Sequence, residues 1–389
     1  MKILRRLFIG LGVVIAVLFL AVWIVMPPVN IPLFDPPAMD EALVSDRLAV
    51  REGYEVSLFA AGIKDARVLR VTDGNHVLVA SPGTGRVLIL YSDEDDDGRS
   101  DGNDVVLEGL NGPNGIDLFN GFLYVAEEDR VGRIGFDGQQ TSGTYEVLVK
   151  DLPGGGNHWK KTLRIGPDGL MYVAVGSSCN VCEEKDRRRG TLLQYQPDGS
   201  DETVFATGLR NSAGFDWSPS DGQLYATDNG RDLLGDEFPP CELNLVVDGG
   251  FYGWPYANGA RIPDPDLGND KQALIANSIP PVFDFPAHNA PLGIVFLRSP
   301  IHRSTNMTGA AVVALHGSWN RTRKDGYKVV SLHWDEEGIK AQDFLTGFLV
   351  DGDVVGRPAE VAEDHQGNIY VSDDFANAVY RVATVPVSS

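Results

Sequence analysis

The chain contains 389 residues, of which 43% are hydrophobic and 22% are charged, so its composition excludes an intrinsically disordered chain and allows a large packed core. Its 54 acidic residues outnumber its 33 lysine and arginine residues and give a formal net charge of −21. Such an acidic chain repels phosphate backbones, which excludes nucleic acid as an expected partner. Three cysteines are too few for a disulfide scaffold.

The N-terminus predicts a membrane anchor. Three basic residues precede an apolar run of 20 residues, 7–26, and a helix of about that length spans a hydrocarbon core of roughly 30 Å. Because basic flanks stay in the cytoplasm, we expect residues 1–30 to form an uncleaved signal anchor in the inner membrane and the rest of the chain to lie in the periplasm. A linker is expected over 31–49 and a single folded domain over 50–385.

Short apolar strands recur along the rest of the chain, and most of them follow a turn that contains Gly or Asn. Their reference residues are separated by 46, 48, 52, 88 and 58 residues, which is the spacing of four-stranded propeller blades. We therefore predict an all-β fold, a six-bladed β-propeller with these strands innermost and an elaborated loop or helix in the longest step. The reference residues are Val79, Val125, Val173, Tyr225, Val313 and Val371.

Polar residues follow these strands. As a set they are more polar and charged than turns require, and in a propeller such strand ends converge at one mouth of the central channel. We therefore expect the functional site at that mouth. The strand-end residues are Ser81, Glu127, Glu128, Ser177, Asp228, Asn229, the segment from His316 to Arg321, Asp373 and Asp374.

The segment DEDDDGRSDGND, residues 93–104, has the spacing of a calcium-binding loop. Carboxylates occupy positions 1, 3, 5, 9 and 12, Gly98 stands at the sharp turn, and the carbonyl of Arg99 is available at position 7. Apolar strands flank the segment, so we predict a structural calcium loop between two strands, with a solvated acidic turn as the alternative. The carboxylates are Asp93, Asp95, Asp97, Asp101 and Asp104.

Cys179 and Cys182 have the spacing of a CxxC pair, which an oxidising compartment would favour as a disulfide that closes a tight loop. A zinc site would need a second pair of ligands, and Cys241 supplies one sulfur with no histidine near it in the sequence. We expect Cys241 to be a small buried thiol.

His158 lies in a loop after three glycines and before a predicted strand. Several arginines stand beside strand ends of this acidic chain, among them Arg210, Arg321 and Arg357. Because a guanidinium binds a carboxylate through two hydrogen bonds, this pattern indicates a pocket for an anionic ligand.

Six segments carry a resemblance to a known family: GGGNHWKKTLRIGPDGLMYVAVGSSCNVCEEKDRRRG, GLRNSAGFDWSPSDGQLYATDNG, ELNLVVDGGFYGWPY, FPAHNAPLGIVF, HGSWNRTRKDGYKVV and GRPAEVAEDHQGNIYVSDD. In this order, over roughly residues 50–385, they closely resemble the glucose/sorbosone dehydrogenases, in particular the sorbosone dehydrogenase-like branch. The resemblance implies a six-bladed propeller that oxidises sugars with pyrroloquinoline quinone (PQQ), usually together with Ca²⁺.

The resemblance also implies a role for each matching residue. His158 aligns with the general base that takes the proton of the sugar C1 hydroxyl while hydride passes to the quinone. Arg210 and Asn211 match the pair that holds the dicarbonyl side of the quinone and stabilises negative charge there. The other implied contacts are Asn229 and the carbonyls of Gly230 and Arg231 toward the cofactor calcium, and Arg321 and Arg357 toward the cofactor carboxylates.

The sequence departs from the soluble glucose enzymes of this family at several positions. Ser177 replaces an Asp, Ser212 and Ala213 replace a Pro-Gln pair, and Arg231 replaces a Pro. The sugar specificity of the soluble glucose enzymes is therefore not transferred to this chain, and the departure at Arg231 weakens the implied calcium contact.

The favoured hypothesis is a membrane-anchored periplasmic dehydrogenase that acts on an aldose or sugar aldehyde. No CxxCH haem motif is present, so we expect electrons to pass to an external acceptor, either a quinone or a small redox carrier. Two alternatives stay open: a non-catalytic, anchored binding module, and a metal-dependent lactonase-type hydrolase. The hydrolase would need a metal cluster drawn from Glu127, Asn114, Asn211 and Asp228.

Overall fold

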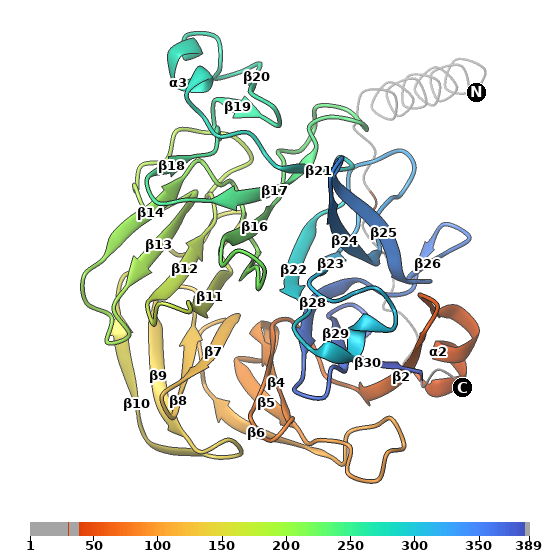
Figure 1. The fold of residues 1–389 in the computed structure, drawn as a ribbon. Helices are drawn as coiled ribbons and strands as arrows, with labels where there is room; N and C mark the ends of the chain where they lie inside the picture. Colours follow the sequence, from red (N-terminus) through yellow and green to blue (C-terminus); the bar gives the residue numbers. More distant parts are fainter. Residues whose placement is uncertain (1–29, 31–38, 386–389) are drawn as a thin grey trace, which may run out of the picture.

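The computed structural model describes residue 30 and residues 39–385, which form a ring of β-sheets around a central axis (Figure 1). Six sheets of four or five strands form the blades in this described part of the chain. The predicted six-bladed all-β propeller is therefore confirmed. The apolar run of the predicted anchor lies outside the described residues, and none of the described helices is long and apolar enough to cross a bilayer.

Each blade is built on four antiparallel strands that are hydrogen-bonded in order from the axis outward, and two blades have a further short strand at the outer edge. The innermost strands are β3 (Leu69–Val71), β7 (Gly115–Phe119), β11 (Lys161–Ile165), β15 (Gly214–Trp217), β22 (Pro291–Phe296) and β28 (Pro358–Glu363). The second strands are β4 (Val77–Ser81), β8 (Phe122–Ala126), β12 (Met171–Val175), β16 (Leu224–Asp228), β23 (Ala311–Leu315) and β29 (Ile369–Asp373). The third strands are β5 (Arg86–Leu90), β9 (Val131–Phe136), β13 (Thr191–Tyr195), β17 (Cys241–Val246), β24 (Lys328–Asp335) and β30 (Ala378–Thr384). The outer strands are β6 (Asn103–Glu108), β10 (Thr141–Val149), β14 (Thr203–Thr207), β21 (Phe283–Phe285), β25 (Gly338–Thr346) and β2 (Tyr54–Ala61).

Several short elements extend this plan at its rim. The longest step of the repeat contains helix α3 and the hairpin β19–β20, which project from the edge of the ring (Figure 1), as expected for the elaborated loop or helix. The short elements are α2 (Glu41–Arg47), α3 (Gln272–Ala276), the 3-10 turns η1 (Pro82–Thr84) and η2 (Pro300–Arg303), and the strands β1 (Ala49–Val50), β18 (Gly250–Phe251), β19 (Ala257–Asn258), β20 (Ile262–Pro263), β26 (Leu349–Val350) and β27 (Asp353–Val354).

The ring is closed by strands from the two ends of the described chain. β2 pairs antiparallel with β30, from Tyr54 opposite Thr384 to Ala61 opposite Ala378. The last blade therefore takes three strands from the C-terminal region and one from the N-terminal region. This closure packs β28, the innermost strand of the last blade, against β3, the innermost strand of the first blade.

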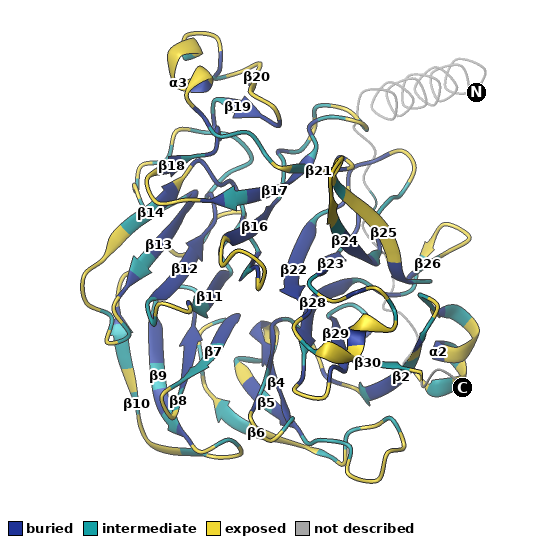
Figure 2. Ribbon diagram, viewed as in Figure 1, coloured by how far each residue is buried: buried dark blue, intermediate teal, exposed yellow. Residues whose placement is uncertain are grey.

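The strands that the repeat analysis took as innermost are the second strands of their blades, and that expectation was wrong. Every residue of β4, β12, β16, β23 and β29 is buried (Figure 2). Strands that are covered on both faces give the most continuous apolar pattern, so the sequence emphasises them. Their C-terminal ends still lie beside the N-terminal ends of the innermost strands, because the two strands are antiparallel.

Charged side chains of alternating sign line the axis, roughly one from each blade. Asp216 contacts Arg164 at 3.3 Å and Arg298 at 3.0 Å. Asp117 contacts Arg70 at 3.5 Å and Arg164 at 3.7 Å. These pairs tie neighbouring blades together around the axis. In blade order the residues are Arg70, Asp117, Arg164, Asp216, Arg298 and Glu360.

Replacing Asp216 tests this charge ring. The Asp216 side chain is 1% exposed. Asp216→Ala removes the only carboxylate that pairs with Arg298 among the described residues and leaves Arg164 with Asp117 alone, so we expect a loss of about 3–5 kcal/mol in the free energy of unfolding. Urea denaturation followed by circular dichroism measures it. The exposed Asp221→Ala is the matched control and should change stability by less than about 0.5 kcal/mol; equal effects of the two substitutions would contradict a stabilising role for the ring.

Candidate functional site

A cavity of about 220 Å³ lies at the N-terminal ends of the innermost strands. All six blades contribute to its lining, so the site exists only when the ring is closed. Polar and charged side chains make up much of the cavity lining. Its principal polar residues are Arg67, Asn114, His158, Lys160, Asn211 and Glu360.

His158 stands three residues before β11, and its ring orientation is set by Ser177. The Ser177 hydroxyl donates to the carbonyl of Cys179 at 2.8 Å, which leaves its oxygen free to accept a hydrogen bond. The Nδ1 atom of His158 lies 2.8 Å from that oxygen and 3.2 Å from the Ser177 carbonyl, so both partners of Nδ1 are acceptors. The proton of a neutral imidazole is thus placed on Nδ1, and Nε2 keeps its lone pair.

The surroundings of His158 favour this neutral form. Burial lowers the pKa of His158 to about 3, and the charges of Arg210 and Arg189 add to the effect. Gly176 makes the close packing possible, because a Cβ atom at this position would lie 2.5 Å from the His158 Cβ atom. At neutral pH the site therefore presents an uncharged base.

Two cationic side chains line the same cavity. Burial and the charge of Arg67 lower the pKa of Lys160 to about 8. The Lys160 ammonium lies 5.5 Å from the centre of the Trp159 ring, and no carboxylate of the described residues pairs with it. Arg67 is paired with Asp374, whose other oxygen lies 2.8 Å from Nε2 of His316. Asp65 and Asp374 raise the pKa of Lys160 only through their charges and form no salt bridge with it, so the Lys160 charge makes the cavity attractive to an anion.

Arg210 is turned away from this cavity. Its Nη1 donates to the carbonyls of Asn229 at 3.1 Å and Gly230 at 2.9 Å, and its Nη2 donates to Asp232 at 2.9 Å. It lines a second, much smaller cavity of about 20 Å³ together with Asn229, Gly230 and Arg231. By contrast, its chain neighbour Asn211 lines the larger cavity with His158. The structure thus separates the expected Arg210–Asn211 pair between two adjoining spaces.

The other predicted arginines lie outside both cavities or are already paired. Arg231 is buried and contacts both oxygens of Asp264 at 2.8 and 2.7 Å. Arg321 donates to Glu237 at 2.6 Å. Arg357 donates to the carbonyl of His316 at 3.1 Å, which connects it to the Asp374 network of the larger cavity.

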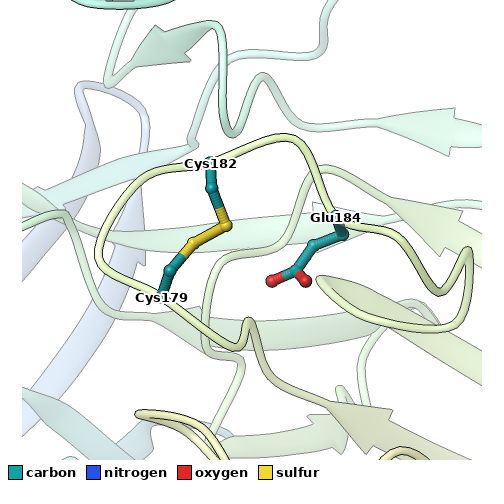
Figure 3. A group of neighbouring side chains, drawn as sticks. All are labelled: Cys179, Cys182 and Glu184. Atoms are coloured by element: carbon teal, nitrogen blue, oxygen red, sulfur yellow. A yellow bond between two sulfur atoms is a disulfide. The ribbon is translucent and has the colours of Figure 1, made fainter.

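Cys179 and Cys182 form a disulfide, and the carboxylate of Glu184 lies beside it (Figure 3). Glu184 accepts hydrogen bonds from the amide and hydroxyl of Ser178 at 2.5 and 2.8 Å. Cys241 is a buried thiol, as expected, and burial raises its pKa to about 11. The disulfide alternative for the CxxC pair is therefore the one that the structure supports.

The acidic loop between β5 and β6 lies apart from the cavity. Oxygen atoms of Asp93, Asp95 and Asp101 lie within 4.8 Å of one another. Asp97 accepts a hydrogen bond from the amide of Arg99 at 2.8 Å, and Asp104 accepts one from the Tyr91 hydroxyl at 2.8 Å. Three of the five predicted carboxylates are thus brought together. The loop amides of Asp97 and Gly98 both donate to Asp93.

Arg67 and Lys160 are not among the residues predicted from the sequence, and His316 and Asp374 are predicted only as strand-end residues. Arg67 precedes β3 by two residues and Lys160 directly precedes β11. A search for cationic residues immediately before the innermost strands would have found both. The signal is weak because the innermost strands are less continuously apolar than the second strands of the blades.

Comparison with known proteins supports the fold and the family. The model of the TrAA12-like family matches residues 48–239 and 266–385. An uncharacterized protein of Borreliella burgdorferi is 28% identical over 362 residues, which cover 87% of this chain and 91% of that protein.

Solved structures share the propeller at lower identity. The calcium structure of the Trichoderma reesei family AA12 carbohydrate-active enzyme has a TM-score of 0.77 at 19% identity and covers 92% of this chain and 99% of its own. The holo PQQ domain of pyranose dehydrogenase from Coprinopsis cinerea has a TM-score of 0.74 at 20% identity, with 91% and 99% covered. The PQQ-bound aldose sugar dehydrogenase of Streptomyces coelicolor has a TM-score of 0.61 at 18% identity, with 87% and 100% covered. Together with the family match, these neighbours confirm the family resemblance that the motifs indicated.

The lowered pKa of His158 predicts a specific acid sensitivity. In the unfolded chain a histidine binds its proton near pH 6.5, whereas in the folded chain this site resists protonation down to about pH 3. Stability should be complete above pH 6.5 and fall below it, by up to about 2 kcal/mol for this residue between pH 7 and pH 5.

Urea unfolding at pH 7 and pH 5 measures this effect. His158→Gln should lose less stability than the wild type on acidification, because the substituted site no longer resists a proton. The exposed His365 provides the control, since His365→Gln should keep the wild-type pH dependence. The same loss in all three proteins would show that His158 is not held neutral by the fold.

Proposed function

This chain belongs to the TrAA12-like family, and from that membership we propose that it is an oxidoreductase that oxidises an aldose or related sugar aldehyde with PQQ. The observation that carries the proposal is the axial cavity, in which the neutral His158 lies with the cationic Arg67 and Lys160. A sugar dehydrogenase needs a base for the sugar hydroxyl and positive charge for an anionic cofactor, and the cavity offers both.

The residues present fit such a cofactor. Lys160 has no carboxylate partner among the described residues although the whole chain is strongly acidic, so its charge is available to a ligand carboxylate. Arg67 supplies a guanidinium as the second cationic group, and Asn211 supplies an amide that both donates and accepts. We propose that Lys160, Arg67 and Asn211 hold the cofactor. When bound, PQQ supplies the electron-accepting carbonyls that take up the hydride of the sugar.

His158 would act on the sugar hydroxyl through Nε2. The contacts of Nδ1 with Ser177 fix the tautomer, so the lone pair of Nε2 is free to accept the proton of the C1 hydroxyl as the C1 hydride departs. A low folded pKa keeps this atom unprotonated across the physiological range. The nearby positive charges also stabilise negative charge that develops in the cavity.

The other contacts that the family resemblance implies, toward the cofactor and its calcium ion, are also proposals. Arg210 and Asn229 are proposed as cofactor contacts, but the guanidinium of Arg210 already binds the carbonyls of Asn229 and Gly230. A calcium ion on the carbonyls of Gly230 and Arg231 would therefore lie close to a positive charge, which disfavours it. Arg321 and Arg357 are proposed as carboxylate contacts, and Arg357 is the better placed of the two through His316.

The lactonase alternative is less well supported. Asn114 and Asn211 line the cavity, but the Asp228 carboxylate accepts the amides of Arg210 and Asn211 at 2.8 and 2.5 Å. Glu127 likewise accepts from the Tyr145 hydroxyl at 3.0 Å. The two carboxylates that the hydrolase would need are thus engaged elsewhere. The binding-module alternative predicts that His158 can be replaced without loss of function.

We also propose the cellular setting of this chemistry. The basic and apolar N-terminal sequence supports an inner-membrane anchor with the propeller in the periplasm. A disulfide between Cys179 and Cys182 fits an oxidising compartment. Electrons would leave to a membrane quinone or a small redox carrier.

His158→Ala tests the proposed chemistry. We expect the variant to bind PQQ nearly as the wild type does, because the cationic groups remain, and to reduce it with aldoses about 10²- to 10⁴-fold more slowly. Equilibrium titration gives the first quantity, and the absorbance of the cofactor during mixing with a panel of aldoses gives the second. Arg187→Ala, at an exposed position, is the control and should match the wild type. Failure of the wild-type protein to bind PQQ at any Ca²⁺ concentration would contradict the proposal.

The acidic loop is proposed as a separate structural calcium site. If Asp93, Asp95 and Asp101 share one ion, Ca²⁺ at 100 times its dissociation constant should add about 2.7 kcal/mol to the free energy of unfolding. Asp101→Asn should remove most of this gain, and Asp73→Asn, at a fully exposed position, should keep it. Urea unfolding with and without Ca²⁺ measures both. An equal response to Ca²⁺ in the two variants would exclude the site.

A further inference from the structure

A loop of four residues, from Cys179 to Cys182, lies between the proposed base and Arg210, and we call it the disulfide loop. Its ends are joined by the Cys179–Cys182 bond (Figure 3). It follows β12 directly after Ser177 and Ser178, on the side of the propeller that carries the cavity. Its atoms contact both His158, through Ser177, and Arg210.

On one side the disulfide loop controls the orientation of His158. The carbonyl of Cys179 accepts the Ser177 hydroxyl at 2.8 Å. Because the Ser177 proton points to that carbonyl, the Ser177 oxygen can only accept from Nδ1 of His158, at 2.8 Å. The Cys179 carbonyl, acting through the shorter of the two Nδ1 contacts, thus reinforces the tautomer that the Ser177 carbonyl at 3.2 Å also favours, and this tautomer leaves Nε2 free.

On the other side the disulfide loop holds Arg210 through Asn180. The carbonyl of Asn180 accepts Nε of Arg210 at 2.9 Å, and its side-chain oxygen accepts Nη2 at 2.9 Å. The same amide side chain also accepts the backbone amide of Asp232 at 2.8 Å and donates to its carbonyl at 3.0 Å. Asn180 therefore fixes both the guanidinium and the segment that carries its counter-ion.

We propose that the disulfide loop is a positioning element for the active site, in which the Cys179 carbonyl orients His158 through Ser177 and Asn180 orients Arg210, and that opening the disulfide slows turnover without unfolding the propeller. This inference rests on the proposed function for its kinetic part only. A disulfide across four residues restricts the conformations that the carbonyl of Cys179 and the side chain of Asn180 can adopt. Reduction by a dithiol such as dithiothreitol transfers two electrons and two protons to the cystine, which becomes two thiols while the reagent becomes a cyclic disulfide.

The first measurement is independent of catalysis. Nitrogen-15 NMR of the full chain labelled at histidine reports the tautomer of each imidazole, and comparison with His158→Gln assigns the signal of His158. In the oxidised protein we expect the Nδ1–H form. After reduction, and in the double variant Cys179→Ser/Cys182→Ser, we expect the His158 signal to move toward the average of two tautomers, while the other histidine signals stay in place. An unchanged His158 signal in both samples overturns the inference.

The second measurement separates positioning from general stability. Ser177→Ala should lower kcat roughly three- to tenfold with little change in KM, because one hydrogen bond to the base is lost. Ser177→Thr keeps a hydroxyl and should restore most of the rate. Ser304→Ala, which removes an exposed hydroxyl far from the cavity, is the matched control. Equal rates for the Ala and Thr variants at position 177 would overturn the role of its hydroxyl.

Asn180→Ala retains the disulfide and tests the other half of the inference. It should weaken turnover by a similar factor and leave the His158 signal unchanged, because it removes only the side-chain contacts to Arg210 and Asp232. Wild-type turnover in this variant contradicts a positioning role for Asn180. If the oxidised wild type turns over no sugar at all, the proposed function fails, and the NMR result still decides whether the disulfide loop orients His158.

Discussion

The antiparallel pairing of β2 with β30 is the constraint on which the rest of the structure depends. The last blade contains only three strands of the C-terminal region, so its fourth must come from the other end of the described chain. When β2 takes that place, β28 is brought against β3 and the six innermost strands surround one axis. The cavity with His158 has a wall from every blade, so it cannot form in a partly closed ring. The cavity therefore forms only when the ring of blades is closed.

Electrostatics near the axis then divides the propeller into two levels. Within the ring, Asp216 and Asp117 balance Arg164 and its neighbours, so their charges stabilise one another between blades. At the N-terminal ends of the innermost strands, Lys160 lacks a carboxylate partner among the described residues. The pKa of Lys160 falls to about 8 because burial and the charge of Arg67 disfavour its charged form. An anionic ligand would relieve that cost on binding. The overall acidity of the chain thus contrasts with a small cationic space at its centre.

Much of this arrangement was predictable from the sequence, because blade strands leave a strong apolar signal at nearly regular spacing. The number of blades and the clustering of Ser177, His158 and Asn211 followed from that signal and from the family resemblance. The identity of the innermost strands did not, since they carry charged residues such as Arg70 and look less like core strands. For the same reason Arg67 and Lys160 were missed. The orientation of Arg210 away from the axial cavity depends on contacts with Asn180 and Asp232, which are far from it in the chain, and local sequence carries no signal for it.

The central claim is that the axial cavity is where a sugar C1–H bond is broken with His158 as the base. The most direct test is anaerobic single turnover of the PQQ-loaded full chain with an aldose carrying deuterium at C1, compared with the unlabelled sugar. The account predicts that cofactor reduction is several-fold slower with the deuterated sugar, and that it is nearly abolished by either sugar in His158→Ala. Reduction at the same rate with both sugars, or undiminished reduction in the variant, would contradict it.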